Sequence, residues 1–81
     1  MLMENVNMQY TISNITPEKV DKGEAEIRKA GGTVYADNSF EVQGVNGSFE
    51  LINNTLTVTI TDKPWLVSWN MIKQGLIEYF G

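Results

Sequence analysis

Residues 64–80 read PWLVSWNMIKQGLIEYF, and this segment decides the fold that we expect. At 100° per residue its large apolar side chains, including both tryptophans of the chain, gather on one face of a helix. The residues on this face are Trp65, Trp69, Ile72, Leu76, Tyr79 and Phe80, with Leu66 and Ile77 at its margins. A helix with so wide an apolar face must pack against another layer, and the preceding residues predict the sheet that receives it.

The amino-terminal part of the chain predicts one strand followed by one helix. Apolar and polar residues alternate over residues 5–13, which indicates a half-buried strand. Thr16-Pro17-Glu18 has the cap, the proline and the acid that are typical of a helix start, and Gly31-Gly32 ends this helix after Ala30. Gly23 lies in the middle of the helix, where glycine costs about 1 kcal/mol relative to alanine. Two interpretations stay open: close approach to a neighbouring element, or a weak point of the helix.

Residues 33–61 predict a meander of four short strands. The clearest strand covers residues 55–61, where leucine, valine and isoleucine alternate with threonine. This pattern is typical of an antiparallel sheet with one buried face and one solvent-exposed face. Two dipeptides predict tight hairpin turns in this region, Asn46-Gly47 and Asn53-Asn54.

The two predicted turns fix which residues pair across the strands. The pairs are Leu51 with Leu56 and Phe49 with Val58 around the second turn, and Gly44 with Phe49 and Val42 with Leu51 around the first. All of these residues then share the buried face of the sheet. The residues expected on the exposed face are Glu41, Gln43, Glu50 and Thr57.

The expected fold is therefore α+β, an antiparallel sheet with two helices on one face in the order β-α-β-β-β-β-α. Asp62 or Lys63 is the expected N-cap of the last helix. The turn before the third strand is ambiguous by one position, so either Val34 or Tyr35 faces inward. We expect residues 1–81 to form a single domain, because a chain of this length has room for one core.

The composition excludes several classes of function. A net charge of −4, with six scattered lysines and arginines, leaves no basic surface for nucleic acid. The absence of cysteine and histidine removes the usual ligands of zinc, haem, iron–sulfur clusters and copper, and every triad built on histidine. The sequence therefore predicts a protein that is not an enzyme, with no catalytic, metal-binding or cofactor-binding residues.

Carboxylates are the remaining candidates for chemistry. Glu41 and Glu50 are expected on the exposed face of neighbouring strands, where two carboxylates could serve as an acid/base pair in a hydrolase. A solvated sheet face explains both residues more simply. An enzyme is therefore the third hypothesis for the function.

The sequence contains no targeting or membrane-spanning pattern. Met1-Leu2-Met3-Glu4-Asn5 is not a basic region followed by an apolar run, so it does not resemble a signal peptide. No segment reaches the ~18 uninterrupted apolar residues that a membrane-spanning helix needs. The expected location is the cytoplasm.

Val67, Met71 and Gly75 carry the leading functional hypothesis. Val67 and Met71 lie one turn apart on the side of the last helix opposite the tryptophans, and Gly75 flanks them. Neighbouring apolar residues on an otherwise polar strip are typical of a contact surface. We therefore expect an interaction module that uses this outer helix face, either to self-associate as a homodimer or to dock on an apolar surface or protein partner. The alternative is a binder of a small apolar ligand held between Trp65, Trp69 and the sheet.

The second half of the chain also suggests a family. Residues 39–51, SFEVQGVNGSFEL, are followed by LTVTI at residues 56–60 and by Trp65-Leu66-Val67-Ser68 before the amphipathic last helix. This run resembles the small polyhydroxyalkanoic acid system (granule-region) proteins, which also look like a strand, a helix, a strand meander with a Gly-Val-x-Gly hairpin and a closing helix. The resemblance implies a cytoplasmic, non-enzymatic protein associated with storage granules, with no catalytic residues to carry over.

Overall fold

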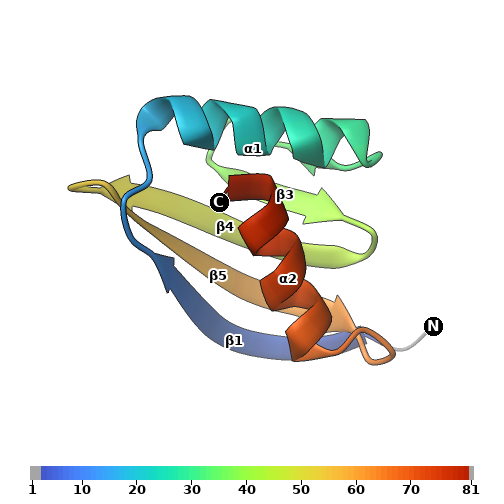
Figure 1. Ribbon diagram of the computed structural model, residues 1–81. Coiled ribbons are helices and arrows are strands. Elements are labelled where there is room, and N and C mark those ends of the chain that lie inside the picture. Colours follow the sequence, from blue (N-terminus) through green and yellow to red (C-terminus); the bar gives the residue numbers. More distant parts are fainter. Residues whose placement is uncertain (1–2, 81) are drawn as a thin grey trace.

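The computed structural model describes the backbone of residues 3–80 and the side chains of residues 7–80. Its elements follow the predicted order β-α-β-β-β-β-α. The described strands form one sheet in the order β1-β5-β4-β3-β2, in which all neighbours are antiparallel, and both helices lie on the same face of it (Figure 1). The elements are β1 (Met3–Ile12), α1 (Pro17–Lys29), β2 (Thr33–Val34), β3 (Ser39–Val42), β4 (Val45–Ile52), β5 (Thr55–Pro64) and α2 (Trp69–Phe80).

The core fills the space between the sheet and the two helices. Alternate residues of β5 point into it, and Leu56, Val58 and Ile60 have no exposed surface. This alternation is the one that the threonine-rich strand predicts, because successive side chains of a strand point to opposite faces. The other buried apolar residues are Ile15, Val20, Ile27, Phe40, Val42, Val45, Phe49, Ile72, Leu76 and Phe80.

Helix α1 begins and ends where its sequence predicts. Thr16 is the N-cap, Ala30 is the C-cap, and Gly31 leaves the helix with a φ of 88°. Gly23 faces α2, where a Cβ atom would overlap the ring of Phe80. Close approach of two helices is therefore the reason for this glycine.

One of the two predicted hairpin turns is confirmed. Asn53 and Asn54 have φ values of 51° and 62°, as a two-residue turn of this kind requires. Phe49 pairs with Val58 across this turn, and Leu51 pairs with Leu56 in the same register. Asparagine tolerates this left-handed backbone better than most residues because its short polar side chain bonds locally.

The other predicted turn is wrong. The chain turns at Gln43 and Gly44, with φ values of 52° and 83°, so Val42 pairs with Val45 rather than with Leu51. Gly47 lies inside β4, where a Cβ atom would overlap the carbonyl oxygen of Thr59. The Asn-Gly sequence therefore satisfies a packing constraint in the sheet rather than a turn.

This register error leaves Val42 and Gln43 on their predicted faces, but it moves Val45 from the exposed face that the predicted register implies to the buried face. The partner of Val42 moves from residue 51 to residue 45, an even number of positions, and side chains alternate with a period of two. Val42 is therefore still buried, and Gln43 is exposed. Gly44 moves from the predicted buried face into the turn. The ambiguity at β2 is also resolved, because Val34 packs against the core whereas Tyr35 is 53% exposed.

The last helix begins later than predicted. Strand β5 runs on to Pro64 because its end pairs with the start of β1, and a turn closed by the Val67 N–H and the Pro64 carbonyl follows. Ser68 is the N-cap, since its Oγ accepts a hydrogen bond from the Met71 N–H at 3.2 Å. The predicted caps Asp62 and Lys63 are strand residues instead.

The predicted apolar face is correct from Trp69 onward and wrong before it. Ile72, Leu76 and Phe80 are buried, and Trp69 and Tyr79 pack partly buried against the core. Trp65 precedes the helix and is 54% exposed, so only one of the two indoles lies on the sheet. The predicted marginal residues Leu66 and Ile77 are also exposed.

Candidate functional site

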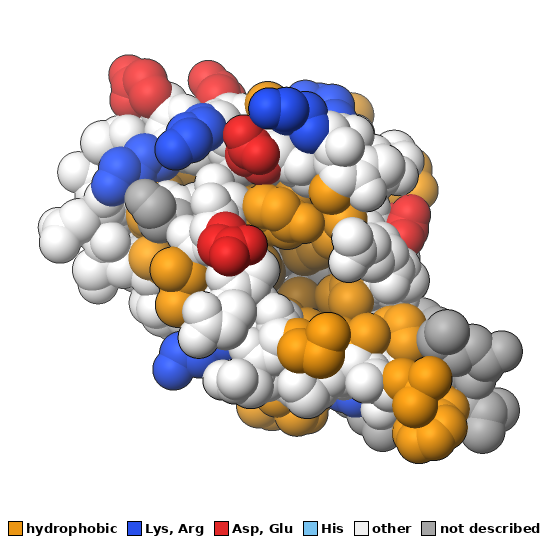
Figure 2. Space-filling view, turned by 45° about the vertical axis from the view of Figure 1, so that its right-hand side comes forward, with side chains coloured by type: hydrophobic (Ala, Val, Ile, Leu, Met, Phe, Trp, Pro, Cys, Tyr) orange, Lys and Arg blue, Asp and Glu red, His pale blue; other side chains and the backbone are white. Residues whose placement is uncertain are grey.

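An apolar groove lies between α2 and the hairpin formed by β3 and β4. Its volume is about 120 Å³. The space-filling view shows a hollow with hydrophobic side chains at its bottom, bordered by further hydrophobic side chains toward the lower edge (Figure 2). The lining residues are Phe40, Val42, Gln43, Val45, Ile60, Val67, Met71, Ile72, Gly75, Leu76 and Tyr79.

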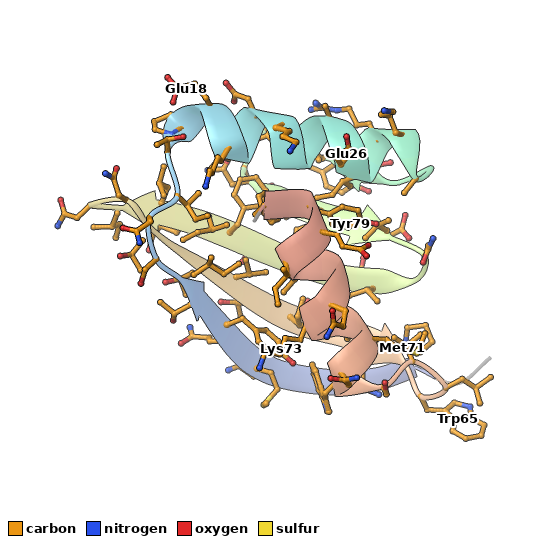
Figure 3. All side chains as sticks on the ribbon, in the orientation of Figure 1. Glu18, Glu26, Trp65, Met71, Lys73 and Tyr79 are labelled. Atoms are coloured by element: carbon orange, nitrogen blue, oxygen red, sulfur yellow. The ribbon has the colours of Figure 1, made fainter. Side chains whose placement is uncertain are left out.

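The helix wall of the groove contains the three residues that the sequence singled out. Met71 and Gly75, together with Tyr79, recur every four residues along α2, so they follow one another on the same side of the helix. Figure 3 shows Met71 and Tyr79 on one side of α2 and Lys73 on the other. Val67 lines the groove from the turn before the helix and is half-buried. The three residues therefore face a groove along the sheet rather than open solvent opposite it.

Gly75 leaves the groove empty where a side chain would fill it. A Cβ atom at this position meets no other atom within 4 Å, in contrast to Gly23 on the other helix. Glycine inside a helix costs about 1 kcal/mol relative to alanine. Neither close packing nor a positive φ requires glycine at position 75.

Tyr79 provides a polar group at the α1 end of the groove. Burial raises the pKa of Tyr79, and the neighbouring carboxylates of Glu78 and Glu26 raise it further. Figure 3 shows Glu26 on α1 directly above Tyr79. The hydroxyl therefore stays neutral at physiological pH and is available as a hydrogen-bond donor or acceptor.

The tryptophans lie outside this groove. Trp69 packs on Tyr10 of β1, with ring centroids 6.3 Å apart, and the buried Lys63 ammonium lies 5.4 Å from the centre of the Trp69 ring. Trp65 projects from the turn before α2 and points away from the sheet (Figure 3). The two indoles therefore do not form the walls of one ligand pocket.

A second apolar hollow borders the opposite side of α2, next to β1. Its volume is about 310 Å³. The residues that line it are Tyr10, Thr11, Ile12, Ser13, Lys73, Leu76 and Ile77. The helix thus has one hollow on each side, and neither is lined by a tryptophan.

The two candidate carboxylates do not face each other. Glu41 pairs with Asn46, whereas Glu50 lies four residues further along β4 and pairs with Thr57. The Glu41 carboxylate accepts a hydrogen bond from the Gly44 N–H at 2.9 Å, so it stabilises the hairpin turn. Among the described residues, no three acidic side chains gather closely enough to hold a metal ion.

Sequence reasoning missed the sheet side of the groove. Phe40, Val42 and Val45 were expected as core residues or not singled out, and they form the wall opposite Gly75. These residues form the wall only in the observed register of the β3–β4 hairpin, in which Val42 pairs with Val45. The predicted register pairs Val42 with Leu51, six positions further along the chain. Val45 is the local signal that favours the observed register, because a turn at Asn46-Gly47 would place this apolar residue on the exposed face.

Comparison with known proteins adds no relative. No protein-family model, no curated protein and no solved structure matches the chain. None of the helices that the structure describes is long and apolar enough to cross a membrane.

Proposed function

We propose that this chain is a cytoplasmic, non-enzymatic interaction module that binds an apolar side chain of a protein partner in the groove beside α2. The observation that carries this proposal is Gly75, a helical glycine that nothing in the fold requires and that keeps the groove open. Met71 extends the contact at the rim, because it is 60% exposed beside the same groove. Exposed apolar residues next to an apolar hollow are typical of protein contact sites.

The size of the groove favours one side chain over a larger ligand. Pockets for drug-sized molecules measure about 300–1,000 Å³. The groove holds about 120 Å³, slightly less than the ~150 Å³ cavity that accommodates benzene in a protein core. A phenylalanine, leucine or methionine side chain of a partner fits that space.

The cytoplasmic location and the family resemblance belong to the same proposal. Both rest on the sequence pattern of residues 39–68, because the family that this pattern resembles is cytoplasmic. Membership of the polyhydroxyalkanoic acid system family would make the partner a protein of the storage granule. The exposed side chain of Met71 also supports a second form of contact, in which the rim of the groove docks on a flat apolar surface instead of enclosing a side chain of a partner.

The test compares two substitutions at one position. Peptides selected from a random display library on the wild-type protein are titrated against Gly75→Ala and Gly75→Leu by calorimetry. We expect the selected peptides to share one large apolar anchor. The Gly75→Ala variant should weaken binding only slightly, by about two- to threefold, because a methyl group fills little of the groove, whereas Gly75→Leu should weaken it at least about tenfold, because its side chain occupies the groove.

Three results would contradict the proposal. The library yields no binders, the binders lack an apolar anchor, or Gly75→Leu binds them as tightly as Gly75→Ala. Unfolding curves of both variants serve as the control, because each must remain folded for its affinity to be informative.

A small apolar ligand is the second candidate, and the hollow beside β1 is the observation that favours it. Its volume of about 310 Å³ reaches the lower end of ligand pockets, which begin near 300 Å³. Lys73 lines this hollow and suits the carboxylate of a fatty acid. Dodecanoate added in the same titrations separates the candidates: saturable quenching of tryptophan fluorescence, from Trp69 against Tyr10, would favour the ligand binder.

A further inference from the structure

The two edges of the sheet differ in how they are protected. The edge strand β2 has only two residues, Thr33 and Val34, and a short edge offers few backbone groups for pairing. The other edge strand, β1, has ten residues. It pairs with β5 on one side, and none of the described elements covers its outer side (Figure 1). Its outward N–H and C=O groups are therefore available to another strand.

The sequence of β1 lacks the features that normally block such pairing. No charged residue and no proline occurs from Asn5 to Thr16, although the chain as a whole has a net charge of −4. Natural edge strands are usually blunted by lysine, proline, a bulge or a cover. Such devices in β1 are confined to its first part, where Glu4 is charged and the register shifts between Asn5 and Met8. The segment from Met8 to Ile12 beyond it is regular and uncharged.

Apolar side chains border this edge on the helix side. Met8 is 44% exposed, and Ile77 of α2 is 48% exposed beside the hollow that Tyr10 and Ile12 line. A strand added at the edge would place every second side chain on this side of the sheet, against α2. The edge thus offers backbone N–H and C=O groups for hydrogen bonding and an apolar surface on which alternate side chains of an added strand can pack. These are the two components of strand addition.

We infer that the β1 edge binds the β1 edge of a second copy of this chain, antiparallel and about a two-fold axis, so that the two sheets become continuous. The strand that fits this edge is uncharged and has apolar residues at alternate positions, and β1 itself is such a strand. Two acidic copies repel each other in general. They meet here along their charge-free segments, so no like charges face each other over Met8–Ile12.

Strand β1 spans nearly the whole length of the molecule. Ten residues of strand extend about 33 Å, close to the longest dimension of the molecule, 36 Å. The inference does not depend on the groove beside α2, which lies on the other side of that helix.

Sedimentation equilibrium over a concentration series tests the dimer. We expect the wild type to change from 9.1 kDa toward twice that mass as its concentration rises. Met8→Lys and Ile77→Lys should weaken dimerisation at least about tenfold, because each would bury an ammonium group at the interface. Ile52→Lys is the matched control: Ile52 is 57% exposed and lies at the far end of β4, so this variant should dimerise like the wild type.

Amide hydrogen exchange provides a second measurement on the wild type alone. The outward amides of Met8–Ile12 should become protected as the concentration rises, because pairing occupies them. The inference is overturned if the wild type stays monomeric up to millimolar concentration, or if both edge variants dimerise as tightly as Ile52→Lys. Loss of the dimer in Met71→Glu alone would place the interface at the groove and would also overturn it. Peptide binding by the Gly75 variants is a separate readout, so the two proposals fail independently.

Discussion

At the scale of single residues, the two helical glycines occupy opposite environments. Gly23 touches the ring of Phe80, which is 1% exposed and packs on Phe49 with ring centroids 6.0 Å apart. The ring has no free space to move into, so a side chain at position 23 would force the helices apart. Gly75 faces open space. Glycine therefore allows close packing of the helices at position 23 in α1, whereas at position 75 in α2 it borders an open groove.

Alanine at these two positions should change stability in opposite directions. We expect Gly23→Ala to lower the free energy of unfolding by about 1–3 kcal/mol through overpacking against Phe80. We expect Gly75→Ala to raise it by about 1 kcal/mol, the difference in helix propensity. Urea unfolding with an unchanged m-value measures both. If both variants changed the free energy of unfolding in the same direction, the result would contradict the environment that the structure gives to one of the two glycines.

At the scale of elements, the β3–β4 hairpin shows how a strong turn signal can be overridden. Asn46-Gly47 has the preferred turn sequence, yet the chain turns at Gln43-Gly44. The carboxylate of Glu41 bonds to the Gly44 N–H and stabilises this turn. Gly47 is required in β4 because the carbonyl oxygen of Thr59 and the ring of Phe40 occupy the space of a side chain. Packing within the sheet thus decides that Gly44, rather than Gly47, lies in the hairpin turn.

Substitution with a turn residue should stabilise the observed hairpin. A left-handed backbone costs an ordinary residue about 1–2 kcal/mol, and asparagine avoids part of that cost. We therefore expect Gln43→Asn to raise the free energy of unfolding by roughly 0.5–1 kcal/mol. Asn46→Ala is the control, with an expected change within about 0.5 kcal/mol, because Asn46 lies in a strand. A large loss in Asn46→Ala would favour the turn at Asn46-Gly47 instead.

At the scale of the whole molecule, the surroundings of Tyr79 depend on both helices. Tyr79 belongs to α2, whereas Glu26, one of the carboxylates that raise its pKa, belongs to α1. The two helices meet where Gly23 lets Phe80 approach. The α1 end of the groove therefore exists only when α2 lies against α1.

Stability should decrease at alkaline pH partly through Tyr79. Its pKa in the folded state is raised above the ordinary value of 10.0 by burial and by Glu78 and Glu26. A raised pKa means that the folded state favours the neutral phenol, so this contribution is complete below pH 10 and is lost as the pH rises through the raised pKa. The free energy of unfolding, measured in urea, should decrease less steeply above pH 10 in Tyr79→Phe than in the wild type. Each protein is referred to its own value at pH 7. An identical alkaline slope would contradict this role.

The sequence by itself determined the order of the elements, both ends of α1, the Asn53-Asn54 turn and the buried face of β5. These features depend on local periodicity and on backbone preferences within a few residues. The predicted contact residues Val67, Met71 and Gly75 also lie together in the structure, along one side of a groove. Their spacing alone predicted that they share one side of the helix, and their role in contact stays a prediction.

Only the tertiary structure decided where β5 ends, how β3 meets β4 and what the groove contains. The end of β5 at Pro64 depends on pairing with β1, from the other end of the chain, and this pairing leaves Trp65 in an exposed turn rather than in a helix. The wall formed by Phe40, Val42 and Val45 depends on where the β3–β4 hairpin turns, and the Asn46-Gly47 signal predicted that position wrongly. The physical reason is the same in both cases: a period of two specifies which face a side chain takes, whereas its partner is chosen by packing between distant segments.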